Sequence, residues 1–178
     1  MTNKELSLLV KEYCEHQKDI FENKINAFKK RPFKQVVATA ANGAEWDGTK
    51  NTHLHWLWSP ARKPSLKRAA KILIGKNAEL KRCKNFQELH DLITTLVGKI
   101  RYIGPVYCYD VALRIGAYNG RLPKTKVYVH AASVRQAACE LGFNINADYT
   151  VDWAVSRLKL PSLNAWVTED FLCDFKKL

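Results

Sequence analysis

The sequence contains no long, uninterrupted run of apolar residues. Its most apolar segment, residues 89–103, is broken by Asp91, Lys99 and Arg101, whereas a membrane-spanning helix needs roughly 18 or more consecutive apolar residues. The first 26 residues mix charged and apolar side chains and therefore lack the uncharged core of a secretory signal. We expect no membrane partner and a cytoplasmic location.

The cysteines lack a regular spacing. The five cysteines are odd in number and include no C-x-x-C pair, so the sequence indicates neither a disulfide framework nor a thiolate zinc site. Buried, reduced thiols are the expected state, and a reactive thiol is the alternative. The sequence also has no internal repeat or low-complexity linker, so residues 1–178 are predicted to form a single domain.

Acidic residues are few relative to basic ones. Lys and Arg number 29 against 17 Asp and Glu, which gives a formal charge of +12. Residues 61–84 carry nine basic residues and one acid, residues 98–126 carry six and one, and residues 145–178 have a net charge of −1. Clustered Lys and Arg supply most of the non-specific affinity of proteins for nucleic acid, so double-stranded DNA is the predicted partner. The alternative is a solvated basic surface that aids solubility.

Helical periodicity and end signals predict a mainly α, compact fold with at most a minor β element. Apolar residues spaced for an amphipathic helix cover residues 4–28, and Pro32 marks the end of that pattern. Ser65 is predicted to cap a second helix, and Asn85 with Glu88 forms a capping box for a third. Further helices are predicted over residues 105–118, 131–141, 152–160 and 168–177, and extended segments over residues 52–58 and 127–129.

The turn before residue 105 is suited to binding phosphate. Residues 100–108 read Ile-Arg-Tyr-Ile-Gly-Pro-Val-Tyr-Cys. Gly104 allows another backbone to approach closely, and a helix that begins at Pro105 presents unpaired N–H groups to an anion. The predicted contacts with the DNA backbone are Arg101, Tyr102, Gly104, Val106, Arg114, Lys124, Lys126, Lys67 and Lys71.

This segment resembles a helix-hairpin-helix motif, whose pattern is apolar, any residue, Gly, apolar, Gly, with a small residue four positions later. The residues that match are Ile100, Ile103, Gly104 and Cys108. Tyr102 stands where the first glycine of the pattern is expected. The hairpin element covers about residues 85–118, and the wider resemblance covers about residues 85–141. A plain αα-hairpin with a tight turn is the alternative.

Such hairpins occur in the helix-hairpin-helix DNA glycosylases, to which this sequence is similar in being mostly helical and basic. In that family the hairpin is followed by a helix, a loop and an extended stretch that leads into another helix, and residues 105–131 fit this order. The resemblance implies extrusion of a damaged or modified base and hydrolysis of its bond to deoxyribose. Members that also cleave the strand have a lysine where this chain has Val106, and the family's catalytic aspartate corresponds to His130. The resemblance therefore implies a monofunctional enzyme whose acid lies elsewhere.

Asp110 is the leading candidate for that acid. Loss of a base builds positive charge on the sugar, which a nearby carboxylate must stabilise. Asp110 is the only acid among residues 98–126 and follows the phosphate-binding turn. An i to i+4 ion pair with Arg114 is its alternative role. His130 and Asp47 are the other catalytic candidates, with Asp47 as the reserve carboxylate.

Histidine and tryptophan residues cluster ahead of the basic segments. On an extended strand His53 and His55 would face the same side, and imidazoles beside indoles can stack on an extruded base and hydrogen-bond its edge. The predicted base-binding residues are His53, His55, Trp46 and Trp56. The H-x-H pair with Asp47 or His130 also suggests metal ligands, but close spacing supplies no complete shell, so no metal is predicted. Ordinary core or surface histidines are a further alternative.

We therefore expect a monofunctional DNA glycosylase that uses no cofactor and no obligatory protein partner. A non-catalytic DNA-binding module with the same hairpin is the second interpretation, and a metal-dependent nuclease that uses His53 and His55 is the third. The sequence leaves open which base is removed. It also leaves open whether the activity repairs damage or, as a defence, attacks chemically modified viral DNA.

Overall fold

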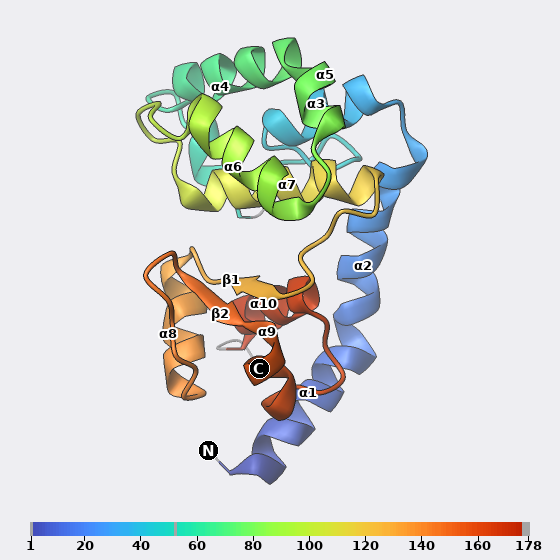
Figure 1. Cartoon of the computed structure of the whole chain (residues 1–178), viewed down its shortest axis with the longest axis vertical. Helices are drawn as coiled ribbons and strands as arrows, with labels where there is room; N and C mark the ends of the chain where they lie inside the picture. Colours follow the sequence, from blue (N-terminus) through green and yellow to red (C-terminus); the bar gives the residue numbers. More distant parts are fainter. Residues whose placement is uncertain (1, 52, 176–178) are drawn as a thin grey trace. The chain divides into compact units, whose positions relative to one another are not determined.

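The computed structural model describes residues 2–51 and 53–175, and this part of the chain is mainly helical, as predicted (Figure 1). It contains ten α-helices, two short 3₁₀ helices and one two-stranded sheet. The chain divides into two compact units: the terminal unit, formed by residues 1–23 and 123–178, and the central unit, formed by residues 24–122. The single domain expected for the whole chain stays a prediction.

The terminal unit joins the start of the chain to its end around one apolar core. Thr2 opens the first helix with a capping box, because its hydroxyl accepts from the Glu5 N–H while the Glu5 carboxylate accepts from the Thr2 N–H. Leu6, Val10 and Tyr13 on that helix belong to the core. The elements are α1 (Asn3–His16), the first part of α2 (Lys18–Ala27), β1 (Lys126–Tyr128), α8 (Ala132–Glu140), β2 (Thr150–Asp152), α9 (Trp153–Lys159) and α10 (Ala165–Asp174).

The sheet of the terminal unit is as small as the sequence indicates. β1 pairs with β2 in antiparallel register, and Val127 lies opposite Val151 with both side chains buried. The Tyr13 hydroxyl donates a hydrogen bond of 2.7 Å to the buried carboxylate of Asp170, which links α1 to α10. Burial and the adjacent Asp170 raise the pKa of Tyr13 far above its ordinary value.

The central unit is built around α7. This helix packs against α3, α6 and η1, and every residue from Tyr107 to Ala117 is buried. A Cβ atom added to Gly116 would lie 2.5 Å from the carbonyl oxygen of Arg121, so glycine is needed where the chain passes close to α7. The elements are the end of α2, η1 (Phe28–Lys30), α3 (Phe33–Ala41), η2 (His55–Trp58), α4 (Lys63–Gly75), α5 (Asn77–Arg82), α6 (Phe86–Val97) and α7 (Pro105–Tyr118).

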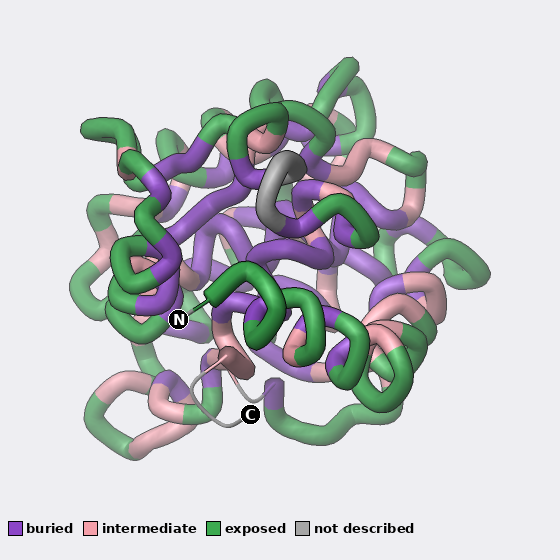
Figure 2. Tube along the Cα trace, turned by 90° about the horizontal axis from the view of Figure 1, so that it is seen from below, coloured by how far each residue is buried: buried purple, intermediate pink, exposed green. Residues whose placement is uncertain are grey.

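Buried and exposed residues alternate along many of the helices, as amphipathic helices require (Figure 2). In α6, for example, Phe86, Leu89 and Ile93 are buried while Gln87 and Asp91 are exposed. Within the described ranges, no helix is both long enough and apolar enough to span a bilayer.

The extended segment predicted over residues 52–58 is wrong. Residue 52 lies outside the described residues, and the chain after it turns into the 3₁₀ helix η2. The indole of Trp56 donates to the carbonyl of His53 and that of Trp58 to the carbonyl of Gly43. The Leu54 N–H also donates to the Asn51 carbonyl, which makes a turn there. Together these contacts favour a helical turn over a strand. His53 and His55 therefore do not share the face of a strand.

Several predicted helix ends also differ from the structure. The helix expected over residues 4–28 is interrupted at Gln17, which ends α1. Arg62 rather than Ser65 occupies the N-cap of α4, because Pro64 is accommodated in the first turn. α10 begins three residues earlier than expected, where Asn164 accepts from the Val167 N–H. Its predicted last residue, Lys177, lies outside the described residues. α3 and α5 were not predicted.

Candidate functional site

The hairpin between α6 and α7 is the first part of the candidate site. Asn85 opens α6 by accepting a hydrogen bond from the Glu88 N–H. After α6 the Ile100 N–H donates to Val97 and the Ile103 N–H donates to Ile100, which closes a tight turn. Ile103 is buried and holds the turn against the unit, while Arg101 is exposed at its tip. The turn therefore lies at the surface and is held to the unit by the buried side chain of Ile103.

Tyr102 adopts a left-handed backbone conformation at the tip of this turn. Its φ angle is 69°, one of two positive values among the described residues other than glycine. An aromatic residue in this region costs about 1–2 kcal/mol relative to glycine. Tyr102 occupies the first glycine position of the predicted motif, and it bends the backbone there in the way that glycine does most readily.

The N-terminus of α7 has no side-chain cap. Gly104 is the N-cap residue and Pro105 follows it, so the first turn of α7 receives no capping hydrogen bond. The N–H groups of Gly104, Val106 and Tyr107 donate to no acceptor among the described residues. A Cβ atom on Gly104 would have no neighbour within 4 Å, and its φ angle is −121°. Neither internal packing nor backbone conformation thus requires glycine here.

Aromatic rings and guanidinium groups from three segments meet beside the hairpin. The Arg62 guanidinium carbon lies 5.2 Å from the centroid of the Trp56 ring and 5.5 Å from that of Tyr102. The Arg101 guanidinium carbon lies 4.7 Å from the Tyr102 centroid. Tyr102 is 37% exposed. We call Trp56, Arg62, Arg101 and Tyr102 the stacked cluster; cation–π attraction holds its members together.

Exposed lysines continue the positive charge along α4. Lys63, Lys67 and Lys71 are spaced by four residues and therefore lie on one face of the helix, about 6 Å apart along its axis. None of the three has an ion pair within the described residues. Because α4 starts next to Arg62, this row of lysines begins at the stacked cluster.

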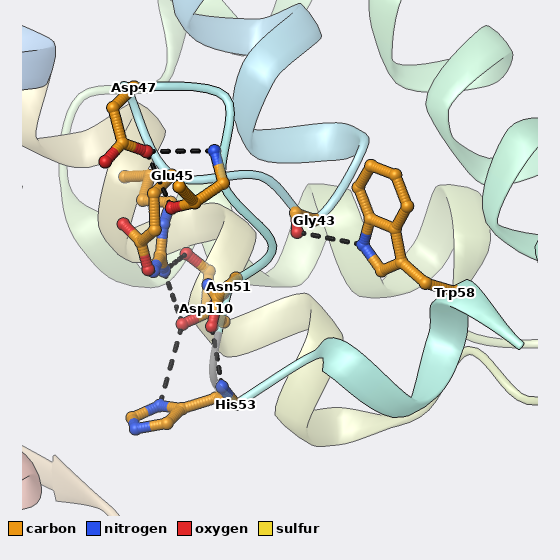
Figure 3. A network of polar contacts seen from close by, with 9 residues as sticks. Gly43, Glu45, Asp47, Asn51, His53, Trp58 and Asp110 are labelled. Carbon is orange, nitrogen blue, oxygen red and sulfur yellow. Dashed lines mark hydrogen bonds and ion pairs between the residues drawn. The ribbon is translucent and has the colours of Figure 1, made fainter.

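A buried polar network surrounds Asp110 (Figure 3). Asp110 is 3% exposed, and its carboxylate forms an ion pair with Arg114 in the next turn of α7. The Asn51 side-chain amide donates to its other oxygen at 2.5 Å. The Nδ1 atom of His53 lies 3.9 Å from the Asp110 carboxylate, and the His53 side chain is 30% exposed. Glu45 completes the network through a 2.8 Å ion pair with Arg114.

This network contains more negative than positive charge. Asp110 and Glu45 share the single guanidinium of Arg114, so the formal charges of these three side chains sum to −1. Burial opposes the charge on Arg114, but the attraction of Asp110 and Glu45 outweighs it, so the pKa of Arg114 is raised above its ordinary value. Two carboxylates held around one guanidinium can stabilise a neighbouring cation.

Arg114 itself does not fit the phosphate contact predicted for it. Its side chain is buried, and its guanidinium donates to Asp110 and Glu45 inside the unit. The i to i+4 ion pair that was the alternative role of Asp110 is thus present. The paired carboxylate of Asp110 still lies near the surface of the unit, because the partly exposed side chain of His53 is adjacent to it.

The side chains of Trp46 and Asp47 have their contacts outside the Asp110 network, contrary to their predicted site roles. Asp47 is exposed and accepts hydrogen bonds from the Thr49 backbone and hydroxyl, which lower the pKa of Asp47. The Arg31 guanidinium carbon lies 4.0 Å from the Trp46 ring centroid, and Phe28 packs against the same ring edge-on. Glu45 rather than Asp47 is therefore the carboxylate that reaches the Asp110 network.

Three predicted site residues belong to the terminal unit. His130 lies between β1 and α8 and contacts the rings of Tyr128 and Tyr149. Lys126 forms a 2.8 Å ion pair with Asp148, whereas Lys124 is exposed. The structure therefore groups His130 with aromatic residues of its own unit.

His55 and His53 differ in their surroundings. His55 begins η2 and is exposed, whereas His53 is half-buried. Across residues 2–51 and 53–175, no three His, Cys, Asp or Glu side chains are grouped so that they could hold a metal ion.

Glu45, Asn51 and Arg62 are functional candidates that were not predicted. Arg62 belongs to the first basic segment, so its charge was a usable signal, but its position beside Tyr102 depends on the fold. Glu45 and Asn51 lie 69 and 59 residues from their partners in the sequence. No local pattern marks residues whose partners are this remote.

Comparisons of the chain with protein-family models, with curated proteins and with solved structures found no match. The case for a function therefore comes from the hairpin, the stacked cluster and the Asp110 network.

Proposed function

We propose that this protein is a monofunctional DNA glycosylase, which binds double-stranded DNA and hydrolyses the bond between a damaged or modified base and its deoxyribose. The observation that carries the proposal is the placement of a buried carboxylate in the same helix whose uncapped N-terminus follows the hairpin. The hairpin would hold the strand, and Asp110 would act on the sugar of one nucleotide.

The strand-binding step is supported by the open amides and by the surrounding charge. The N–H groups of the partly exposed residues Gly104 and Val106 lie at a helix N-terminus, where the helix dipole adds attraction for a phosphate. Arg101 at the turn adds a cation, as do the lysines of α4. Such contacts position the nucleic acid without reading its sequence.

The chemical step is supported by the geometry of the Asp110 network. Asp110 lies five residues after the start of α7, about 7.5 Å along the helix axis. Its network has a net negative charge, which would stabilise the positive charge that develops on the sugar as the base departs. Water supplies a hydroxyl group to the sugar carbon, and the base leaves with the electrons of the broken bond and takes up a proton.

Two of the predicted base-binding residues, His53 and Trp56, have a place in this step. His53 lies between the Asp110 carboxylate and the partly exposed surface, where it could contact the extruded base or orient the water. Trp56 lies in the same segment and presents an aromatic ring beside the hairpin. Val106 offers no amine, so a covalent imine with the sugar is not part of the proposal.

The test is an assay for abasic sites. Duplexes that each carry one damaged or modified base are incubated with the protein and then treated with alkali, which breaks the strand at abasic sites. Asp110→Asn should abolish base release and retain DNA binding, whereas the matched control Asp47→Asn, at an exposed carboxylate, should leave both unchanged. His53→Gln, at a half-buried position, should lower release without unfolding the protein. Undiminished release by Asp110→Asn would reject the catalytic role.

The pairing of Asp110 with Arg114 specifically favours a second candidate, a non-catalytic DNA-binding module. In that case the carboxylate stabilises the fold and the hairpin alone contacts DNA. The same assay distinguishes the candidates, because a binding module leaves every duplex intact before and after alkali. Metal-dependent breaks without alkali would instead indicate a nuclease.

A further inference from the structure

The stacked cluster has features that backbone binding does not explain. The open amides of α7 and the lysines of α4 are sufficient to contact phosphates. Neither requires an aromatic side chain at the tip of the hairpin. Tyr102 nevertheless places a ring there, at a backbone position where glycine would be less strained.

Tyr102 is a partly exposed residue, and its ring is flanked by positive charge. It is 37% exposed, and guanidinium groups lie near it from Arg101 and from Arg62. Neither arginine has an ion pair with an acidic side chain of the described residues. The cluster therefore combines a partly exposed tyrosine with two cations that no carboxylate of the described residues neutralises.

We propose that Tyr102 is a stacking platform for an unpaired nucleobase in a DNA strand held at the hairpin. Every base has an aromatic face that can stack on tyrosine, and guanidinium planes can stack on bases or pair with the flanking phosphates. The Arg62 guanidinium lies near both the Trp56 ring and the Tyr102 ring, so cation–π attraction favours this position of the Tyr102 ring. The inference rests on the proposed strand binding but does not depend on base release.

The proposal predicts a preference between forms of DNA. In an intact duplex each base is paired and stacked on its neighbours, so its face is not available to Tyr102. A duplex with one unpaired base offers a face at a small cost in stacking energy. The protein should therefore bind the duplex with one unpaired thymine more tightly than the otherwise identical intact duplex.

Fluorescence anisotropy with these two duplexes and with an oligothymidine strand tests the proposal. Tyr102→Phe, which keeps the ring, should bind all three as the wild type does. Tyr102→Gly and Tyr102→Asn remove the ring and tolerate a positive φ angle. They should bind the unpaired-base duplex and the single strand roughly 5- to 150-fold more weakly, and their preference over the intact duplex should disappear.

Two controls separate stacking from charge and from unfolding. Loss of stacking should leave the slope of log affinity against log salt unchanged, whereas Arg101→Ala should reduce that slope by about 1. Tyr102→Gly should melt no lower than the wild type, because glycine relieves the backbone strain. If Tyr102→Gly and Tyr102→Asn bind the unpaired-base duplex as tightly as the wild type, or if the wild type shows no preference for it, the stacking role is overturned. Stacking without base release would instead overturn only the enzymatic proposal.

Discussion

Replacing Gly104 by Asp should make the protein more stable while weakening its binding to DNA. Gly104 is the N-cap of α7, its φ angle suits any residue, and a Cβ atom there meets no neighbour. An Asp side chain at an N-cap accepts from free helix N–H groups and improves on glycine by a few tenths of a kcal/mol, and its charge adds about 0.3–1 kcal/mol through the helix dipole. Together these gains are about 0.5–1.4 kcal/mol in the free energy of unfolding.

The same carboxylate would occupy the amides proposed to hold a phosphate. Two like charges about 4 Å apart repel by about 1 kcal/mol in water and about 4 kcal/mol near a protein surface. DNA binding should therefore weaken by between roughly 5-fold and several hundred-fold. Gly104→Asn is the matched control, since it caps the helix without a charge and should cause a smaller loss.

Thermal denaturation followed by circular dichroism measures the first effect, and anisotropy of a labelled duplex over a range of salt concentrations measures the second. The stabilised variant should melt about 1–6 °C above the wild type for a chain of this size. If Gly104→Asp melts higher yet binds the duplex as tightly as the wild type, the amides of α7 do not contact DNA and the reasoning is refuted.

Two further perturbations test the interior of the central unit. Arg114→Met leaves Asp110 and Glu45 without their shared counter-charge and should lower the free energy of unfolding by about 3–5 kcal/mol in urea titrations, against a smaller loss for Arg114→Lys; a loss below about 1 kcal/mol would contradict the network. Burial raises the pKa of Tyr107 well above its ordinary value, so the unfolded chain ionises first. The free energy of unfolding should therefore keep the contribution of Tyr107 below about pH 10 and decrease as the pH rises above it. Tyr107→Phe should make this decrease shallower by about 1.4 kcal/mol per pH unit. An unchanged decrease would count against a buried hydroxyl.

Local signals were sufficient for several helices and insufficient for others. The bounds of α7 follow from Pro105 at its start and from the turn at Gly120, whose φ angle of 65° ends the helix. α3 was missed because Pro32 reads as the end of one helix, whereas the structure uses it as the N-cap of the next. Phe33, Val36 and Val37 already carry the spacing of a buried helical face.

The candidate site divides in the same way. The pairing of Asp110 with Arg114 is predictable, because residues four apart on a helix are neighbours. The contact between Asn51 and Asp110 depends on how the loop after α3 folds. The alternating aromatic pattern in that loop predicted a strand, whereas the structure has the 3₁₀ helix η2 there. The sequence shows only that Tyr102 stands where the motif has glycine. Its left-handed backbone conformation is known from the structure.

The account depends on whether the backbone at the start of α7 binds a DNA strand. Titrating ¹⁵N-labelled protein with a short duplex and following the amide resonances in NMR spectra tests this most directly. The account predicts that the largest shifts fall on Gly104 and Val106, with smaller ones on Arg101, Tyr102 and the buried Tyr107. Shifts that leave these five amides unchanged while others move, or no shifts at all, would contradict it.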